Sequence, residues 1–371
     1  MRFDKGHIES AQDAARREPT DRVCLAWLTD AELPSWDAWV DRHPLAVVYH
    51  CSPWMRVLES AFPHMKGEVL VLRNAGSGEI LGGLPICQVR SWILGTRRVS
   101  IPYASIGDPL VSNAGDLNRL LSGLTAKHGA NGVEVRTWRT PASYFTDAPV
   151  VDRALHHVVD LAPGPEDIYR RLSRTAVRRM ISKGTKAGIQ VVEARGSSEW
   201  TEFHRLLTAS RRALGLPAMP LAFFEAIRQC LPESRRLLLL AIKDGRPIGG
   251  ALGLKSSGVF ILEYSGEETL GSGSGAGQMV YWESLRRACI EGCRWFSFGR
   301  TSIDNSGLAA YKRHWATVEE ELLSFGPGMT QTSRKAVAGS SKTRRLIGAV
   351  SRYAPHPVYR LLSNFCYRHW G

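Results

Sequence analysis

The stretch LLAIKDGRPIGGALGLKSSGVFILEYSGEE, Leu239 to Glu268, contains three runs of apolar residues separated by two short turns. The turns fall at Asp244-Gly245 and Ser257-Gly258. Pairs of this kind favour tight hairpin connections, because glycine adopts positive φ angles without steric cost. The stretch therefore predicts three consecutive antiparallel strands.

A second stretch in the first half of the chain has the same pattern. LVLRNAGSGEILGGLPI, Leu70 to Ile86, is again a hydrophobic strand, a glycine turn and an apolar strand that contains Gly-Gly. Each half also reads in the same order: helix, helix, three strands, helix, strand. We therefore expect an α+β fold made of two tandem, duplicated units, with mixed, mostly antiparallel sheets flanked by helices.

The length of 371 residues agrees with two domains rather than one. The boundary is expected at LAPGPED, residues 161–167, where proline and glycine cluster. We expect a flexible N-terminal tail over 1–20, a first unit over 21–160, a second and catalytic unit over 161–328, and a basic tail over 329–371.

The composition indicates a globular protein, with 44% hydrophobic and 22% charged residues. No apolar run approaches the roughly 20 residues that span a bilayer, and the polar N-terminus does not resemble a secretory signal. We expect a cytoplasmic protein, with the inner face of the cytoplasmic membrane as a second location. The seven cysteines are scattered without ligand spacing, so no metal site is expected.

The net charge of +13 is unevenly distributed. Residues 169–192 hold many Arg and Lys and no acid, and residues 329–371 hold eight Lys or Arg and no acid. Such segments attract the phosphates of nucleic acids, anionic lipids or nucleotide-linked substrates, although a solvated helix face is an alternative. Arg174, Arg178 and Arg179 are the candidates for binding substrate phosphates.

The C-terminal segment RRLIGAVSRYAPHPVYRLLSNFCYRHW mixes arginine with leucine and aromatic residues. Pro355 and Pro357 predict that it forms two short helices. This composition suits a peripheral membrane contact, and docking on the protein's own surface is the alternative.

A glycine-rich stretch, GSGSGAGQ, residues 271–278, precedes a predicted helix. Backbone N–H groups at a helix N-terminus bind anions, so Gly273, Gly275, Gly277 and Gln278 are candidates for holding a donor phosphate. Only the looser G/A form of the dinucleotide fingerprint fits the spacing, and Lys-Ser/Thr of a P-loop is missing after the last glycine. A linker without ligand is the alternative.

The stretch FSFGRTSIDNSGLAAYKRHW, Phe296 to Trp315, resembles the FemAB-like, BioF2-like acyltransferases of the GNAT superfamily. Their pattern is aromatic-Asp-Phe-Gly-Arg, a glycine-containing loop, then Phe-Lys-x-x-Trp-Gly. The likeness extends over residues 35–328 and is strongest to the branch associated with exopolysaccharide and exosortase loci. The chain departs from the pattern at four positions: Ser297 replaces Asp, Tyr311 replaces Phe, Ala316 replaces Gly, and Leu270 stands where ordinary GNAT enzymes have Gln or Arg.

The resemblance implies an N-acyltransferase that moves an acetyl-type group from acyl-CoA to an amine on a cell-envelope polysaccharide or a peptidoglycan precursor. An aminoacyl-tRNA is the alternative donor, with a peptidoglycan or lipid-linked precursor as acceptor. A non-catalytic protein that binds nucleic acid or anionic lipid is the alternative of another class.

The resemblance also assigns expected roles to single residues. Lys312 would lie near the donor carbonyl, where a cation stabilises an oxyanion, with a surface lysine on a turn as the alternative. Glu263 would act as the base or orient the amine, and Tyr264 and Tyr311 would position the acceptor or leaving group. Arg300 would bind a phosphate of donor or acceptor, with a buried structural ion pair as the alternative.

Overall fold

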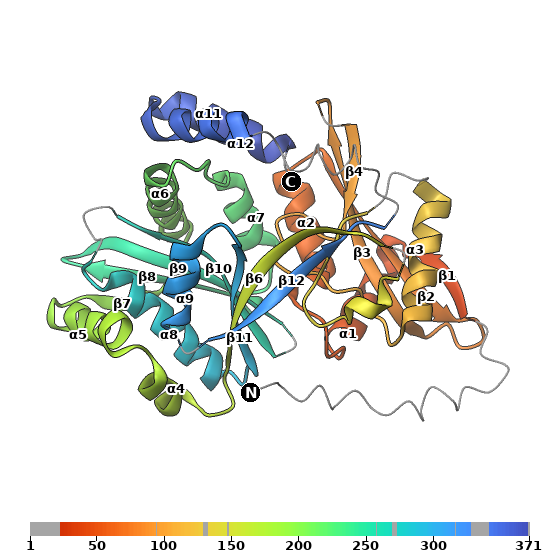
Figure 1. Cartoon of the computed structure of the whole chain (residues 1–371), viewed down its shortest axis with the longest axis horizontal. Coiled ribbons are helices and arrows are strands. Elements are labelled where there is room, and N and C mark those ends of the chain that lie inside the picture. Colours follow the sequence, from red (N-terminus) through yellow and green to blue (C-terminus); the bar gives the residue numbers. More distant parts are fainter. Residues whose placement is uncertain are drawn as a thin grey trace.

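The computed structural model describes residues 23–93, 95–128, 133–146, 148–256, 258–268, 273–315, 317–327 and 341–369. These residues form one four-stranded and one eight-stranded sheet with helices packed on both (Figure 1). The smaller sheet runs in the order β1 (Val23–Trp27), β2 (Met65–Asn74), β3 (Ile80–Ser91) and β4 (Gly95–Val99). The expected N-terminal tail and the start of the C-terminal tail lie outside the described residues.

The larger sheet is mixed, and only one of its pairings, between β10 and β11, is parallel among the described strands. Its order is β5 (Val135–Thr137), β12 (Val318–Phe325), β6 (Val150–Asp160), β11 (Trp295–Ser302), β10 (Val259–Glu267), β9 (Arg246–Ser256), β8 (Arg236–Lys243) and β7 (Gln190–Glu193). The helices are α1 (Leu33–Val40), α2 (Ser52–Ala61), α3 (Ala114–His128), α4 (Pro165–Arg171), α5 (Arg179–Lys186), α6 (Ser197–Ala213), α7 (Leu221–Cys230), α8 (Ala276–Ile290), α9 (Ser306–Arg313), α11 (Ser341–Tyr353) and α12 (His356–His369).

The duplicated order expected from the two hairpins is confirmed. The hairpins β2–β3–β4 and β8–β9–β10 have the same antiparallel connections, and each is followed by a helix and a further strand. In the first unit, among the described residues, β4 meets the residue before β5 through one parallel bridge between Val99 and Glu134. In the second unit β11 pairs with β10 in parallel.

The repeated glycine pair has a packing reason in both units. A Cβ on Gly83 would lie 2.6 Å from Cζ3 of Trp36 on α1, and a Cβ on Gly250 would lie 3.0 Å from Cδ2 of Phe203 on α6. Each strand therefore omits a side chain where the aromatic ring of a covering helix presses on the sheet. Trp36 and Phe203 are fully buried as a result.

Both units contribute strands to the larger sheet and side chains to a common core. Strand β6 precedes the expected boundary at residues 160 and 161, yet it lies inside the larger sheet between β12 and β11. The expected division into domains stays a prediction. The ring of Trp54 on α2 meets that of Phe223 on α7 at 5.9 Å, so one apolar core connects both halves.

The C-terminal segment forms two helices, α11 and α12, that end and begin around Pro355 as expected. Both lie over α6 and α7 (Figure 1), and the hydroxyl of Tyr359 donates to the carbonyl of Leu216 at 2.9 Å. Within the described part of the chain, no helix has the length and apolar composition needed to cross a membrane.

Candidate functional site

Strands β10 and β11 pair only at their beginnings. Val259–Ile261 pairs with Trp295–Ser297, and each strand then has an irregularity against its other neighbour. In β10 it falls between Leu262 and Tyr264, and in β11 between Ser297 and Arg300. Beyond this point the backbones of the two parallel strands no longer bond to each other, which leaves polar groups in the middle of the sheet available to side chains and ligands.

Glu263 occupies the irregular position of β10. Its Oε2 atom accepts hydrogen bonds from the hydroxyl of Tyr49 at 2.7 Å and from the hydroxyl of Ser105 at 2.9 Å. Both donors belong to the first half of the chain. Burial raises the pKa of Glu263 above its ordinary value, against the opposing effect of the two hydroxyl groups and of Lys312. A carboxylate with a raised pKa is suited to accept a proton near neutral pH.

Lys312 approaches the same place from α9. Its side chain is only 6% exposed, and Nζ donates to the carbonyl oxygens of Phe298 at 2.5 Å and Gly299 at 3.3 Å. Burial lowers the pKa of Lys312 to about 8, and the charge of Glu263 opposes that shift. An ammonium group has three donors, so two backbone acceptors leave capacity for a ligand.

Gly299 lies between these two groups. Its φ of 65° belongs to the left-handed region, and a Cβ placed on it would lie 3.7 Å from Oε2 of Glu263. Since its carbonyl bonds to Lys312, this one residue separates a carboxylate from a cation. The structure thus brings together, on opposite sides of Gly299, Glu263 and Lys312, two of the three residues that the sequence analysis assigned to catalysis with Tyr311.

The unusual Ser297 holds the bend at Gly299. Its hydroxyl accepts the N–H of Gly299 at 3.0 Å and lies 2.7 Å from Nε2 of His156 on β6. Burial lowers the pKa of His156 to about 3, with Lys312 adding to the effect, so this imidazole is neutral. A serine and a neutral histidine therefore fill the position where the related pattern has Asp.

Three residues of this site were missed by the sequence analysis: Tyr49, Ser105 and His156. Tyr49 and Ser105 lie in stretches without a motif, and His156 and His157 form a histidine pair on a strand that matches no metal or catalytic spacing. Their partners are 214, 158 and 141 residues away along the chain.

The described part of the glycine-rich loop packs against residues 169–192, which we call the basic segment. Gly275 caps α8 with a φ of 94°, and a Cβ on it would lie 2.1 Å from the carbonyl oxygen of Met180. Lys183 on α5 donates to the carbonyl of Gly273 at 2.6 Å. Gly277 and Gln278 form the first turn of α8. Residues 269–272, including Leu270, lie outside the described residues, as does Ala316.

A carboxylate approaches the same helix N-terminus. Oε2 of Glu267, at the end of β10, lies 3.1 Å from the position of a Cβ on Gly277. Burial raises the pKa of Glu267 to about 7. The neutral form therefore has a substantial population at neutral pH, and a neutral carboxyl group does not repel a phosphate. The sequence analysis did not single out Glu267.

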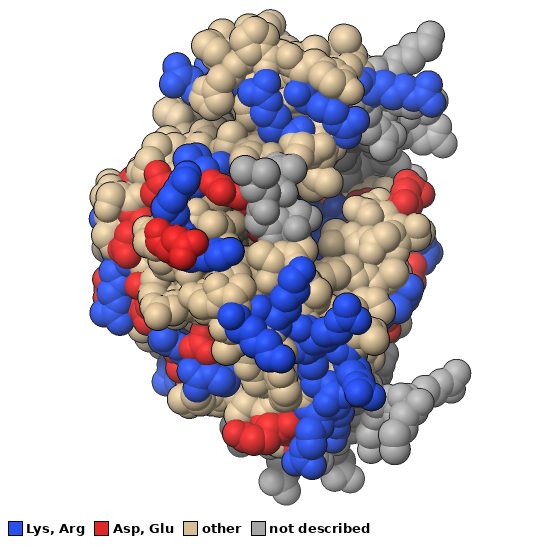
Figure 2. All heavy atoms as spheres, turned by 90° about the vertical axis from the view of Figure 1, so that its left-hand side faces the viewer, with Lys and Arg blue, Asp and Glu red and all other residues tan. Residues whose placement is uncertain are grey.

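Three arginines of the basic segment have no acidic partner among the described residues. Residues 174–178 form a π-helical turn that leads into α5. Arg174, Arg178 and Arg179, with Tyr169 and Thr175, line a surface hollow of about 540 Å³. Among the described residues, none of these three arginines has an acidic oxygen within ion-pair distance. Figure 2 shows the resulting concentration of Lys and Arg on this face of the molecule.

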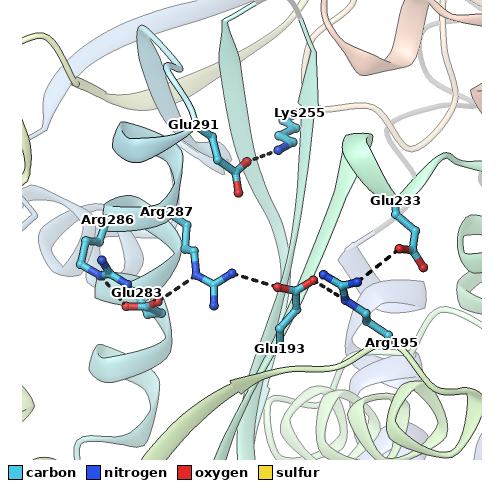
Figure 3. A network of polar contacts seen from close by, with 8 residues as sticks. All are labelled: Glu193, Arg195, Glu233, Lys255, Glu283, Arg286, Arg287 and Glu291. Carbon is cyan, nitrogen blue, oxygen red and sulfur yellow. Dashed lines mark hydrogen bonds and ion pairs between the residues drawn. The ribbon is translucent and has the colours of Figure 1, made fainter.

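The arginines at the other end of α8 are paired, by contrast. Arg287 bonds to Glu193 on β7 at 2.9 Å and to Glu283 at 3.0 Å, and Arg195 bonds to Glu193 at 2.8 Å (Figure 3). Lys255 on β9 pairs with Glu291 in the same view. These contacts tie α8 to the sheet and so fix the direction of its N-terminus.

The remaining candidates lie in structural contacts. Arg300 forms an ion pair with Asp152 across β11 and β6, and both side chains are exposed, whereas the structural alternative was a buried pair. Tyr264 is buried between the rings of Phe223 and Phe224, and Tyr311 packs against Trp315. Their assigned roles in binding or catalysis stay predictions. Within the described ranges, no group of three or more His, Cys, Asp or Glu side chains is placed to hold a metal ion.

Residues 171–313 match the family model described as an acetyltransferase (GNAT) domain. The crystal structure of FemX superposes with a TM-score of 0.66 at 13% identity, over 80% of this chain and 96% of that chain. A tandem GNAT protein from the clavulanic acid biosynthesis pathway gives 0.52 at 15% identity, over 82% of this chain and 98% of that one. L-PGS from Bacillus licheniformis gives 0.53 at 12% identity, over 87% and 98%.

No curated protein sequence matches the chain. The structural matches are likenesses of fold. They confirm the expected tandem GNAT-like architecture, and the likeness to the GNAT domain model extends over residues 171–313.

Proposed function

We propose that this chain, which carries a GNAT acetyltransferase domain over residues 171–313, transfers an acyl group from acyl-CoA to an amine on a cell-envelope polysaccharide or peptidoglycan precursor. The observation that carries the proposal is the meeting of Glu263 and Lys312 on either side of Gly299, where β10 and β11 stop pairing. A base and a cation at one point are what acyl transfer to an amine requires.

The transfer is a direct displacement. The amine nitrogen forms a bond to the carbonyl carbon of the thioester while the bond from that carbon to sulfur breaks, and the thiolate leaves. Glu263 takes the proton that the amine loses, and the hydroxyls of Tyr49 and Ser105 orient this carboxylate. Lys312 stabilises the negative charge that develops on the carbonyl oxygen.

The donor phosphates would bind at the start of α8 and on the basic segment behind it. The helix N-terminus attracts an anion, and the pairing of Arg287 at the opposite end holds the helix in place. Acyl-CoA meets these requirements with its pyrophosphate and its additional phosphate. The three unpaired arginines along the hollow also favour a second donor, aminoacyl-tRNA, whose longer phosphate chain would contact more of them.

The experiment supplies the purified chain with acetyl-CoA or with aminoacyl-tRNA and an amino-sugar or lipid-linked acceptor. We expect release of free thiol and acylated amine with acetyl-CoA. Product that forms only with aminoacyl-tRNA, and is lost after ribonuclease treatment, would replace the donor and leave the transfer mechanism intact.

The Lys312→Ala variant separates an enzyme from a binding protein. We expect it to lose turnover while its affinity for the acceptor, measured by calorimetry, stays within about twofold. Unchanged cellular function of Lys312→Ala would contradict the enzyme and support a binding role for nucleic acid or anionic lipid.

A further inference from the structure

Helix α12 has two apolar faces. Tyr359, Ser363 and Cys366 are buried against the rest of the protein. Val358, Leu361 and Phe365, at spacings of three and four residues, lie on the opposite face and are exposed, Leu361 to 68%. A helix that only docked on the protein's own surface would need one apolar face.

Helix α11 and the turn between β3 and β4 extend this second face. Leu346 and Tyr353 lie two turns apart on α11, opposite the buried Ser351, and Tyr353 is 77% exposed. In the turn, Trp92 is 76% exposed, and its ring contacts Phe365 of α12 at 6.5 Å. The outer apolar surface consists of Trp92, Ile93, Leu346, Tyr353, Val358, Leu361 and Phe365.

The charges on the two segments that carry the outer apolar surface have one sign. Exposed arginines accompany it, namely Arg90, Arg345, Arg352, Arg360 and Arg368. No acidic residue occurs in the sequence from 329 to 371 or from 88 to 99. The end of the molecule formed by the C-terminal helices shows Lys and Arg but no Asp or Glu in Figure 2.

We propose that the outer apolar surface docks on a membrane rich in anionic phospholipid. Leucine and aromatic side chains enter the boundary between head groups and acyl chains, while arginine stems lie along it and their charged ends meet lipid phosphates. A second copy of this chain fits less well, because it would place arginines against arginines with no acid between them. A nucleic acid would leave the leucines exposed.

The buried side of α12 connects, through aromatic side chains, with the strand of the candidate site. The hydroxyl of Tyr103 donates to the carbonyl of Tyr367 on α12, and the ring of Tyr103 contacts Phe223 at 6.2 Å. Phe223 in turn contacts Tyr264, the neighbour of Glu263 on β10. These contacts connect α12 with the strand that carries Glu263, and docking would bring the molecule to a membrane that holds a lipid-linked amine. That consequence rests on the proposed function, whereas the docking itself does not.

The experiment measures sedimentation of the full chain with vesicles, without donor or acceptor. We expect binding to vesicles of phosphatidylglycerol and phosphatidylcholine at about 0.1 M salt, and little binding to phosphatidylcholine alone. Leu361→Gln should weaken binding by roughly tenfold. The pair Arg345→Gln and Arg360→Gln should weaken it by about fivefold for each arginine.

Matched substitutions elsewhere control for exposure and charge. Ile290→Gln replaces a side chain that is 63% exposed on α8, and Arg246→Gln replaces an exposed arginine at the start of β9. Both should bind vesicles like the unaltered chain. Three results would overturn the proposal: no sedimentation with anionic vesicles, equal binding by Leu361→Gln and Ile290→Gln, or a dimer in light scattering that Leu361→Gln dissociates. The last result would make a second copy the occupant.

Discussion

The helix that follows the three antiparallel strands begins differently in the two units of the chain. In the first unit α3 begins with its own acid: Asp116 is buried, its backbone N–H bonds to the Asn113 side chain, and its carboxylate pairs with Arg119. In the second unit the first turn of α8 contains no acid, its cap is Gly275, and the cationic α5 lies against it. The first helix start has an acid in its own first turn, whereas the second has, in the described part of the chain, only the hydroxyl of Ser274 on the N–H of Ala276 and the carboxyl of Glu267 close to Gly277.

The strands next to these helices also differ between the two units, in how they pair and in the residues they supply. In the first unit β4 meets the residue before β5 at one bridge among the described residues, and the segment after β4 sends Ser105 toward the second unit. In the second unit the early parting of β10 and β11 makes room for Glu263 and Lys312. Under the proposed function, the second half would bind the donor and carry out the reaction, and the first half would supply supporting hydrogen bonds. The four predictions below test this division of roles.

The largest effect is expected from Lys312→Ala in the second unit. Loss of a donor to the developing oxyanion should lower kcat/KM by about 10²–10³. Arg313→Ala, on the next position of α9, removes an exposed arginine that pairs with Glu319 and should cost less than about threefold. Equal losses for the two variants, at equal thermal stability, would show that Lys312 is not the cation of the reaction.

The second prediction compares the loss of unfolding free energy when one glycine of each unit is replaced. Gly275→Ala places a methyl group against the backbone of Met180 in a left-handed conformation, so unfolding free energy should fall by about 3 kcal/mol or more. Gly78→Ala, at φ 73° in the first hairpin, meets no atom within 4 Å and should cost only about 1–2 kcal/mol. Chemical denaturation of both variants measures the difference. A smaller loss for Gly275→Ala would mean that α8 and α5 are not in this contact.

A third prediction concerns the support that the first unit gives. Tyr49→Phe removes a donor that stabilises the charged form of Glu263, so the pKa of Glu263 should rise further. The acidic limb of the pH–rate profile should then move up by about one pH unit, since such a bond contributes about 1.5 kcal/mol or more. Tyr144→Phe, whose hydroxyl bonds to the carbonyl of Ser112, should leave the limb in place. A limb that stays fixed in Tyr49→Phe would exclude Glu263 as the base.

The smallest effect is on stability at alkaline pH. The pKa of Lys312 is lowered to about 8 in the folded chain, so between pH 8 and 10 the unfolded chain binds more protons at this group. Stability should therefore increase with pH there, by about 1 kcal/mol from pH 8 to 9 relative to Lys312→Met. Urea denaturation of both proteins at the two pH values measures this difference. Parallel pH dependences would show that Lys312 is not buried with a lowered pKa.

The sequence predicted what local chemistry determines. The Asp244-Gly245 turn and the two Gly-Gly strands specify the hairpins, and Lys312 and Glu263 were assigned from a motif and a strand position. The partners of Glu263 could not be predicted, because Tyr49 and Ser105 become neighbours only when the first unit packs on the second. The role of Ser297 likewise depends on His156 of another strand. The pairing of β6 with β12 and β11 could not be predicted either, because it joins strands that are far apart in the sequence.

Strand β6 also determines how the chain can be divided. It is the only described strand that joins β12 to β11, so a fragment that begins after residue 160 would split the larger sheet into two pieces with newly exposed edges. Such edges pair with other chains and promote aggregation. We therefore expect the two halves to unfold together, and a fragment that begins after residue 160 to aggregate.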